Sequence, residues 1–85
     1  MKHAGPAALD LLEDVLIAVR RHAALRERGR GVFYSRSDAF LHFHEDPAGP
    51  FADLKVERRW VRLRVATKRE RLKLLREVAR ALPPR

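Results

Sequence analysis

The sequence predicts a single α+β domain of the order αββββα: an amphipathic helix, a four-stranded antiparallel meander and a second amphipathic helix. Two observations predict this order. Apolar residues recur at helical spacing near both ends of the chain, and they alternate with polar residues in the middle. Because 85 residues hold one hydrophobic core, we expect one domain over residues 1–85, with a folded part at about 6–82.

The first helix is expected to run from Pro6 to Arg28. Proline suits the first turn of a helix, and Gly29 is the expected stop. The apolar stripe that should face the core consists of Leu9, Leu12, Leu16, Val19 and Ala23.

A period of two then predicts the strands of the meander. They are expected at Val32–Ser35, Ala39–His44, Phe51–Glu57 and Trp60–Val65. Turns are expected at residues 35–38 and 58–59, and the breaker-rich residues 45–50 are expected to form a loop.

Thr67 and Glu70 have the spacing of a capping box, which predicts that the second helix begins there. Its apolar stripe is expected at Leu72, Leu75, Val78, Ala79 and Leu82. Each helix has an apolar stripe that must be buried. The sheet is the only large apolar surface expected in the domain, so both helices are predicted to pack on the same face of it. The other face of the sheet is then left open.

Composition narrows the classes of function. The chain has no cysteine, which excludes disulfides, thiolate nucleophiles and cysteine-based metal sites. It has no apolar run of membrane-spanning length and no apolar leader, so a cytoplasmic protein without a membrane partner is expected. The absence of Asn and Gln, with abundant arginine, is typical of thermophiles and of GC-rich genomes. The net charge of +8 points to polyanions as partners.

The open face is predicted to mix aromatic and cationic side chains. The expected turns place Phe33 opposite Phe40, and they place Asp53 between His42 and Arg64. The residues expected on the face are Phe33, Phe40, Phe51, Lys55, Trp60, Arg62 and Arg64. Three interpretations compete: an interface for a second copy or another partner, a stacking platform for nucleic acid, and aromatic rings shielded by long arginine stems.

A metal or ligand site is the second hypothesis for this face. His42 and His44 lie two residues apart, on the same side of one strand, and Asp53 is expected across from His42. Imidazole and carboxylate groups are common metal ligands and acid–base groups. The competing structural interpretation is a cross-strand ladder in which His42 and Arg64 flank Asp53.

The remaining sequence features give weaker indications of a function. The last helix presents a basic stripe at Arg69, Lys73, Arg76 and Arg80, which suits a phosphate backbone or simply a solvated helix face. The chain has no glycine-rich phosphate loop and no nucleophile elbow. No cofactor is therefore expected, and a catalytic role is less favoured than a binding role.

One run of sequence carries a resemblance. Residues 40–49 (FLHFHEDPAG), 51–54 (FADL) and 63–67 (LRVAT) together resemble a family of small uncharacterised proteins from high-GC and thermophilic bacteria. A fainter similarity is to bacterial domains labelled luciferase-like. The resemblance implies a recurring module and no activity.

The favoured function is therefore a non-catalytic binding or interaction module that works through its open sheet face as a homodimer. Nucleic-acid binding and a small metal- or ligand-binding enzyme are the alternatives.

Overall fold

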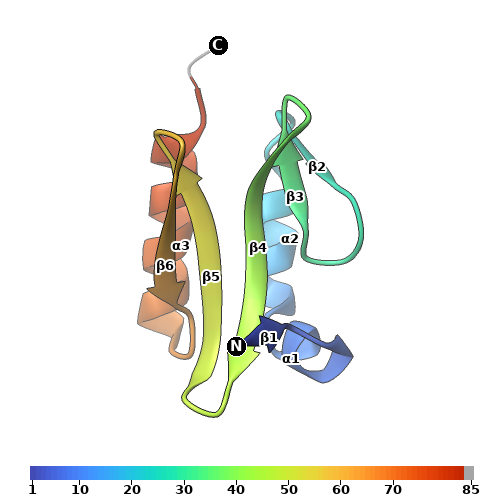
Figure 1. Ribbon diagram of the computed structural model, residues 1–85, viewed down its shortest axis with the longest axis vertical. Helices are drawn as coiled ribbons and strands as arrows, with labels where there is room; N and C mark the ends of the chain where they lie inside the picture. The colour runs from blue at the N-terminus through green and yellow to red at the C-terminus, as the bar shows by residue number, and fades with distance from the viewer. Residues whose placement is uncertain (84–85) are drawn as a thin grey trace.

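The computed structural model, which describes residues 1–83, is an α+β fold built on one antiparallel sheet. The sheet contains β1 (Lys2–His3), β2 (Leu25–Glu27), β3 (Phe33–Ser35), β4 (Asp38–Asp46), β5 (Gly49–Val56) and β6 (Arg59–Arg64). The helices are α1 (Pro6–Leu11), α2 (Glu13–Arg20) and α3 (Lys68–Ala81). Figure 1 shows α2 and α3 on the same side of the sheet. The predicted α+β class is confirmed.

The sheet has six strands instead of the predicted four. Its order is β2-β3-β4-β5-β6, and β1 pairs with the end of β4 that β3 leaves free. The two additional strands are two and three residues long. Strands this short give no alternation that could be recognised in the sequence. They form because they pair with strands elsewhere in the chain.

The predicted first helix was too long. It is interrupted at Leu12, whose ψ of 10° separates α1 from α2, and it ends at Arg20. Leu25 to Glu27 form β2 against β3 instead of further helical turns. Ala23, expected in the buried stripe, is therefore exposed in the connection, whereas the other four members of the stripe are buried.

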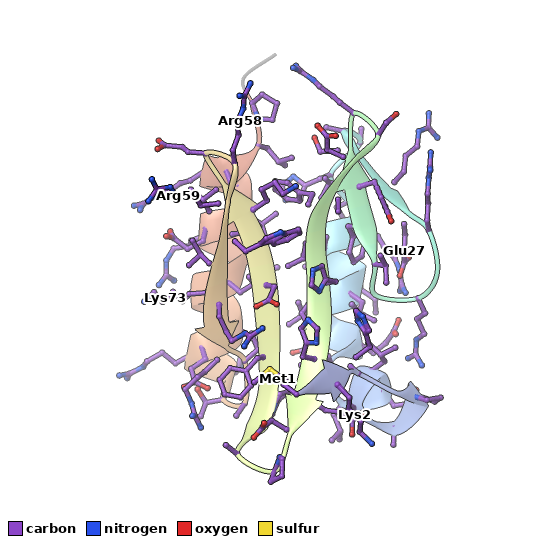
Figure 2. The ribbon with its side chains drawn as sticks, in the orientation of Figure 1. Met1, Lys2, Glu27, Arg58, Arg59 and Lys73 are labelled. Carbon is purple, nitrogen blue, oxygen red and sulfur yellow. The ribbon has the colours of Figure 1, made fainter. Side chains whose placement is uncertain are left out.

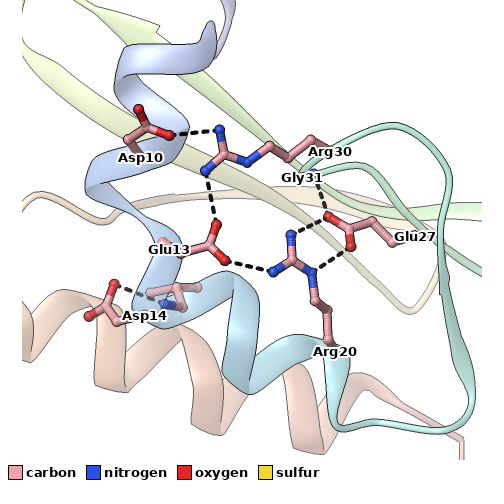
Figure 3. A network of polar contacts seen from close by, with 8 residues as sticks. Asp10, Glu13, Asp14, Arg20, Glu27, Arg30 and Gly31 are labelled. Carbon is pink, nitrogen blue, oxygen red and sulfur yellow. Dashed lines mark hydrogen bonds and ion pairs between the residues drawn. The ribbon is translucent and has the colours of Figure 1, made fainter.

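A network of ion pairs holds β2 against the helices (Figure 3). Arg20 binds Glu27 and Glu13 at 2.6 and 2.8 Å, and Arg30 binds Glu13 at 2.9 Å. The carboxylate of Glu27 also accepts a hydrogen bond from the backbone N–H of Gly31. Because these groups bridge residues far apart in the chain, they fix the strand where the helix was predicted to continue.

Gly31 shows why the loop after β2 needs glycine. Its φ is +79°, and a Cβ atom there would lie 2.8 Å from a methyl carbon of Leu9. A side chain would therefore meet both backbone strain and a clash with the core.

The pairing of β3 with β4 contains a bulge. Phe33 lies opposite Leu41, whereas Tyr34 lies opposite Ala39, so Phe40 is an extra residue in β4. The predicted pairing of Phe33 with Phe40 was wrong for this reason, since a bulge breaks the alternation of side chains. Both phenylalanines are buried in the core, which removes them from the predicted open face.

The predicted register of β6 was wrong by two residues. The turn after β5 is made by Glu57 and Arg58, both with positive φ, one position earlier than expected. Asp53 therefore lies opposite Arg62 instead of Arg64. A shift of two residues leaves every side chain on its predicted face, so the composition of that face survives the error.

The core lies between the helices and the sheet. Its fully buried members come from every layer: Leu12, Leu16 and Val19 from the first helical segments, Leu41, Leu54 and Val65 from the sheet region, and Leu74 and Val78 from α3. On α3 the predicted stripe was partly wrong, because Leu74 is buried and Leu72 and Ala79 are exposed. Among residues 1–83, no helix has the length and apolar character needed to cross a membrane.

The predicted capping box of the last helix is confirmed. Glu70 N–H donates to Oγ1 of Thr67 at 3.1 Å, and Thr67 N–H donates to the carboxylate of Glu70 at 3.0 Å. The same carboxylate accepts from Ala66 N–H. Three backbone donors at the start of α3 are thus satisfied without water.

Substitution of the cap should weaken the fold measurably. We expect Thr67→Ala to lower the free energy of unfolding by about 0.5–2 kcal/mol, the usual cost of a lost N-cap. Thr67→Ser, which keeps the hydroxyl, should stay close to wild type. Urea denaturation of the two variants measures this, and equal losses would show that the methyl group of Thr67 matters more than its hydroxyl.

Candidate functional site

Three histidines from two strands converge on the face of the sheet that α2 and α3 do not cover. His42 and His44 alternate along β4 on this outer face. His3 lies directly opposite His44, because β1 pairs with the end of β4. Directly paired residues of antiparallel strands share a face, so β1 adds a third imidazole. Figure 2 shows Lys2, the neighbour of His3, at the end of the sheet opposite Arg58 and Arg59.

The three imidazole rings contact one another. The ring of His3 stacks on that of His44 with a centroid separation of 4.8 Å, and the ring of His42 meets that of His44 edge-on at the same separation. One nitrogen from each ring lies within 4.8 Å of the other two. Nitrogen ligands of a tetrahedral zinc ion are about 3.4 Å apart, given Zn–N bonds of about 2.0–2.1 Å, so the three nitrogens would have to move closer together to share one ion.

Several ring nitrogens of this cluster are buried without a partner. Nδ1 of His42 and both ring nitrogens of His44 are shielded from solvent and make no hydrogen bond with residues 1–83. Nε2 of His44 lies 3.1 Å from Asp53, close enough for an ion pair but not aligned for a hydrogen bond. Because an unpaired buried polar group costs about 1–3 kcal/mol, an occupant that binds these nitrogens would remove an energetic penalty.

Asp53 lies beside His44 and is held in place by Arg62. Its side chain is 10% exposed, and both of its oxygens accept hydrogen bonds from Arg62, at 2.8 and 2.9 Å. Oδ2 of Asp53 is the same oxygen that faces His44. One ring nitrogen of His44 therefore faces a carboxylate and the other faces no partner. A carboxylate in this position orients a metal-binding imidazole in many metalloproteins.

The electrostatics favour the neutral form of His42 and the ionised form of Asp53. Burial lowers the pKa of His42 below its usual value, and the neighbouring charge of His44 acts in the same direction. The hydrogen bonds from Arg62 lower the pKa of Asp53, and Asp53 in turn raises the pKa of Arg62. His42 thus favours the neutral imidazole, the form that donates a lone pair to a metal, next to a carboxylate that ionises more readily than usual.

The aromatic residues that remain on this face are each covered by a cation. Nζ of Lys55 lies 4.7 Å from the ring centroid of Trp60, and the guanidinium of Arg64 lies 5.4 Å from that of Phe51. Trp60 is still 45% exposed, and its ring contacts His42 with a centroid separation of 4.7 Å. Of the aromatic residues predicted on this face, Phe51 and Trp60 remain beside the histidines, each with its cation.

The predicted basic stripe is exposed along α3. All four of its members are at the surface: Arg69, Lys73, Arg76 and Arg80. Arg80 pairs with Glu77 at 3.3 Å, with most of its side chain in solvent. The structure does not bring these residues to the histidine cluster, which lies across the sheet on β1 and β4.

His3 is the site residue that sequence reasoning missed. The predicted set was His42, His44 and Asp53; the structure places Asp53 opposite His42 and beside His44. His3 lies in a two-residue strand that no periodicity reveals, and it is brought to the cluster by pairing with β4. The one available signal was its identity, since it is one of four histidines in the chain.

Comparisons with protein-family models, with curated proteins and with solved structures find no significant match for this chain.

Proposed function

We propose that the protein binds a transition-metal ion of the Zn²⁺ class through His3, His42 and His44, with Asp53 orienting His44. The observation that carries the proposal is the convergence of three imidazoles that include buried, unpartnered nitrogens. Imidazole is a preferred ligand of Zn²⁺, Cu²⁺ and Ni²⁺, whereas Mg²⁺ and Ca²⁺ prefer oxygen. The donor set thus selects the class of metal.

The cross-strand ladder expected as the structural alternative accounts for only part of this arrangement. The bidentate contact between Arg62 and Asp53 is such a ladder, and it satisfies both groups. It leaves the buried nitrogens of His42 and His44 unsatisfied. A metal ion supplies what the ladder lacks, since it accepts lone pairs from imidazoles at short range.

The direct test is titration with Co²⁺, a spectroscopic substitute for Zn²⁺. We expect one ion per chain and visible absorption bands from nitrogen coordination. His42→Ala should lower the affinity by more than about 100-fold, because losing a ligand costs more than the about 10–100-fold typical of outer-shell changes. His22→Ala is the matched control, since His22 follows α2 away from the cluster and should bind Co²⁺ like wild type.

Two outcomes would refute the proposal: an absence of Co²⁺ binding by the folded protein, or equal affinities in wild type and His42→Ala. Affinity should also rise with pH through the range in which imidazoles lose their protons. A titration that is flat across this range would indicate binding by carboxylates instead.

Self-association and nucleic-acid binding stay predictions for the same face. Burial of Phe33 and Phe40 leaves Phe51 and Trp60 as its aromatic surface, each beneath a cation. A smaller and already covered aromatic surface gives less support to a stacking platform or to a dimer interface than the imidazole cluster gives to a metal site.

A further inference from the structure

The number of protein ligands in the proposed metal site determines whether the ion can bind a further molecule. Among residues 1–83, the group of potential ligands comprises His3, His42 and His44 alone. Asp53 is nearby, but both of its oxygens are held by Arg62. Structural zinc sites close with four protein ligands, whereas sites with three protein ligands keep a position for an exogenous molecule. A metal ion held here therefore has an open position.

The surrounding charge selects the kind of molecule for that position. Three cations lie one contact away from the imidazoles. Arg62 reaches His44 through Asp53, and Lys55 reaches His42 through the ring of Trp60.

The third cation, Arg64, lies over Phe51, which is paired with His44 across β4 and β5. Two of the three cations have carboxylate partners: Arg62 contacts Asp53, and Arg64 lies 3.6 Å from Glu70. Imidazoles bind a metal ion in their neutral form and leave the full charge of a divalent ion in place, so the ion and Lys55 together give the site a surplus of positive charge.

Access to the position is from solvent. The helices α2 and α3 lie on the other side of the sheet (Figure 1). The side chains of Arg62 and Arg64 are each about half exposed. Their guanidinium groups already contact Asp53 and Glu70, and the five N–H donors of each guanidinium leave further donors for a ligand that approaches the ion. Guanidinium groups form paired hydrogen bonds with the oxygens of phosphate.

We propose that the open position on this metal ion takes the oxyanion of a phosphate monoester or of inorganic phosphate, gathered by Lys55, Arg62 and Arg64; this inference rests on the proposed metal function. A phosphate monoester carries about −1.5 to −2 charges near neutral pH, more than a carboxylate or the singly charged diester of a nucleic-acid backbone. The dianion therefore gains most from a divalent ion with a surplus of positive charge around it.

The experiment uses protein loaded with one equivalent of Co²⁺, so that free Co²⁺ is negligible, and follows the visible spectrum. The probes are inorganic phosphate, acetate and a single-stranded oligonucleotide without terminal phosphates. We expect a saturable spectral change with phosphate at concentrations at which acetate and the oligonucleotide have little effect.

Variants of the rim then test the role of the cations. Arg64→Ala and Lys55→Ala should each lower phosphate affinity about 2–5-fold, the effect of losing one exposed ionic contact. The affinity for Co²⁺ is measured separately for each variant, and phosphate is titrated at equal occupancy. Arg69→Ala, an exposed cation of α3, is the matched control and should leave phosphate affinity unchanged.

The outcomes separate the two proposals. If Co²⁺ does not bind, the metal function itself fails. If Co²⁺ binds with the histidine dependence described above but phosphate leaves the spectrum unchanged, the metal function stands and the phosphate inference is overturned. Acetate as effective as phosphate, or an oligonucleotide that binds more tightly, also overturns the choice of a dianionic phosphate.

Discussion

Asp53→Asn should impair both folding and metal binding. The substitution keeps the shape of the side chain but removes the charge that Arg62 contacts through two hydrogen bonds. We expect the metal-free protein to lose about 1.5–3 kcal/mol of unfolding free energy, the range for hydrogen bonds to charged groups. Co²⁺ affinity should fall about 10–100-fold, because His44 loses the carboxylate that orients it. Urea denaturation with a chelator and Co²⁺ titration measure the two effects.

The stability difference between wild type and Asp53→Asn should depend on pH. Arg62 holds the pKa of Asp53 in the folded chain below its usual value of 3.8. The folded state therefore releases this proton more readily than the unfolded state. The resulting stabilisation is fully present above that usual value and is lost as pH falls through the lower pKa of the folded state. The difference should thus shrink as the solution is acidified from about pH 4 toward pH 2.

The control for this variant is Asp38→Asn, which changes an exposed carboxylate at the start of β4. It should affect neither stability nor Co²⁺ affinity by much, since isolated surface substitutions usually change stability by less than about 0.5 kcal/mol. If Asp53→Asn lost stability but bound Co²⁺ as tightly as wild type, Asp53 would be a cross-strand ion-pair partner with no role in the metal site.

Leu54→Ala should have the largest effect on stability. Leu54 follows Asp53 on β5, faces the opposite side and is completely buried. We expect a loss of about 2–5 kcal/mol, the usual cost of truncating a buried leucine to alanine. This is a large share of the about 5–15 kcal/mol that stabilises a typical domain. The midpoint of urea denaturation measures it.

Val61→Ala is the matched comparison, because Val61 lies directly opposite Leu54 on the edge strand β6 and is 39% exposed. Its loss should be well below that of Leu54→Ala. The fraction of Leu54→Ala that remains folded should bind Co²⁺ like wild type, since Leu54 contributes nothing to the outer face. Equal losses in the two variants would mean that the core extends to the edge of the sheet.

The features that the sequence predicted well are those decided by neighbouring residues. Thr67 and Glu70 form the capping box that their spacing indicated. The loop expected at residues 45–50 was too long, because β4 continues to Asp46 and β5 begins at Gly49, but the predicted pairing of His42 with Asp53 is confirmed. In both cases, the residues that determine the geometry lie within a few positions of one another.

The features that were missed depend on distant residues. Nothing local shows that Leu25 should leave the helix, because the partner that makes it a strand is β3. The turn at Glu57 and Arg58 contains no glycine or asparagine to locate it, so the position of Arg62 was misjudged. His3 reaches the site through a pairing with β4 some forty residues along the chain.

Because the sheet has its hydrophobic core on the helix side, its two faces can evolve at different rates. Residues such as Leu54 and Leu41 on the helix side hold the fold together and tolerate little change. Exposed side chains on the other side that make no buried ion pair can be exchanged at a small cost in stability, provided that the alternation of the strands is kept. A scaffold of this kind can acquire a new ligand while its architecture stays the same, so relatives with the same fold need not bind the same molecule.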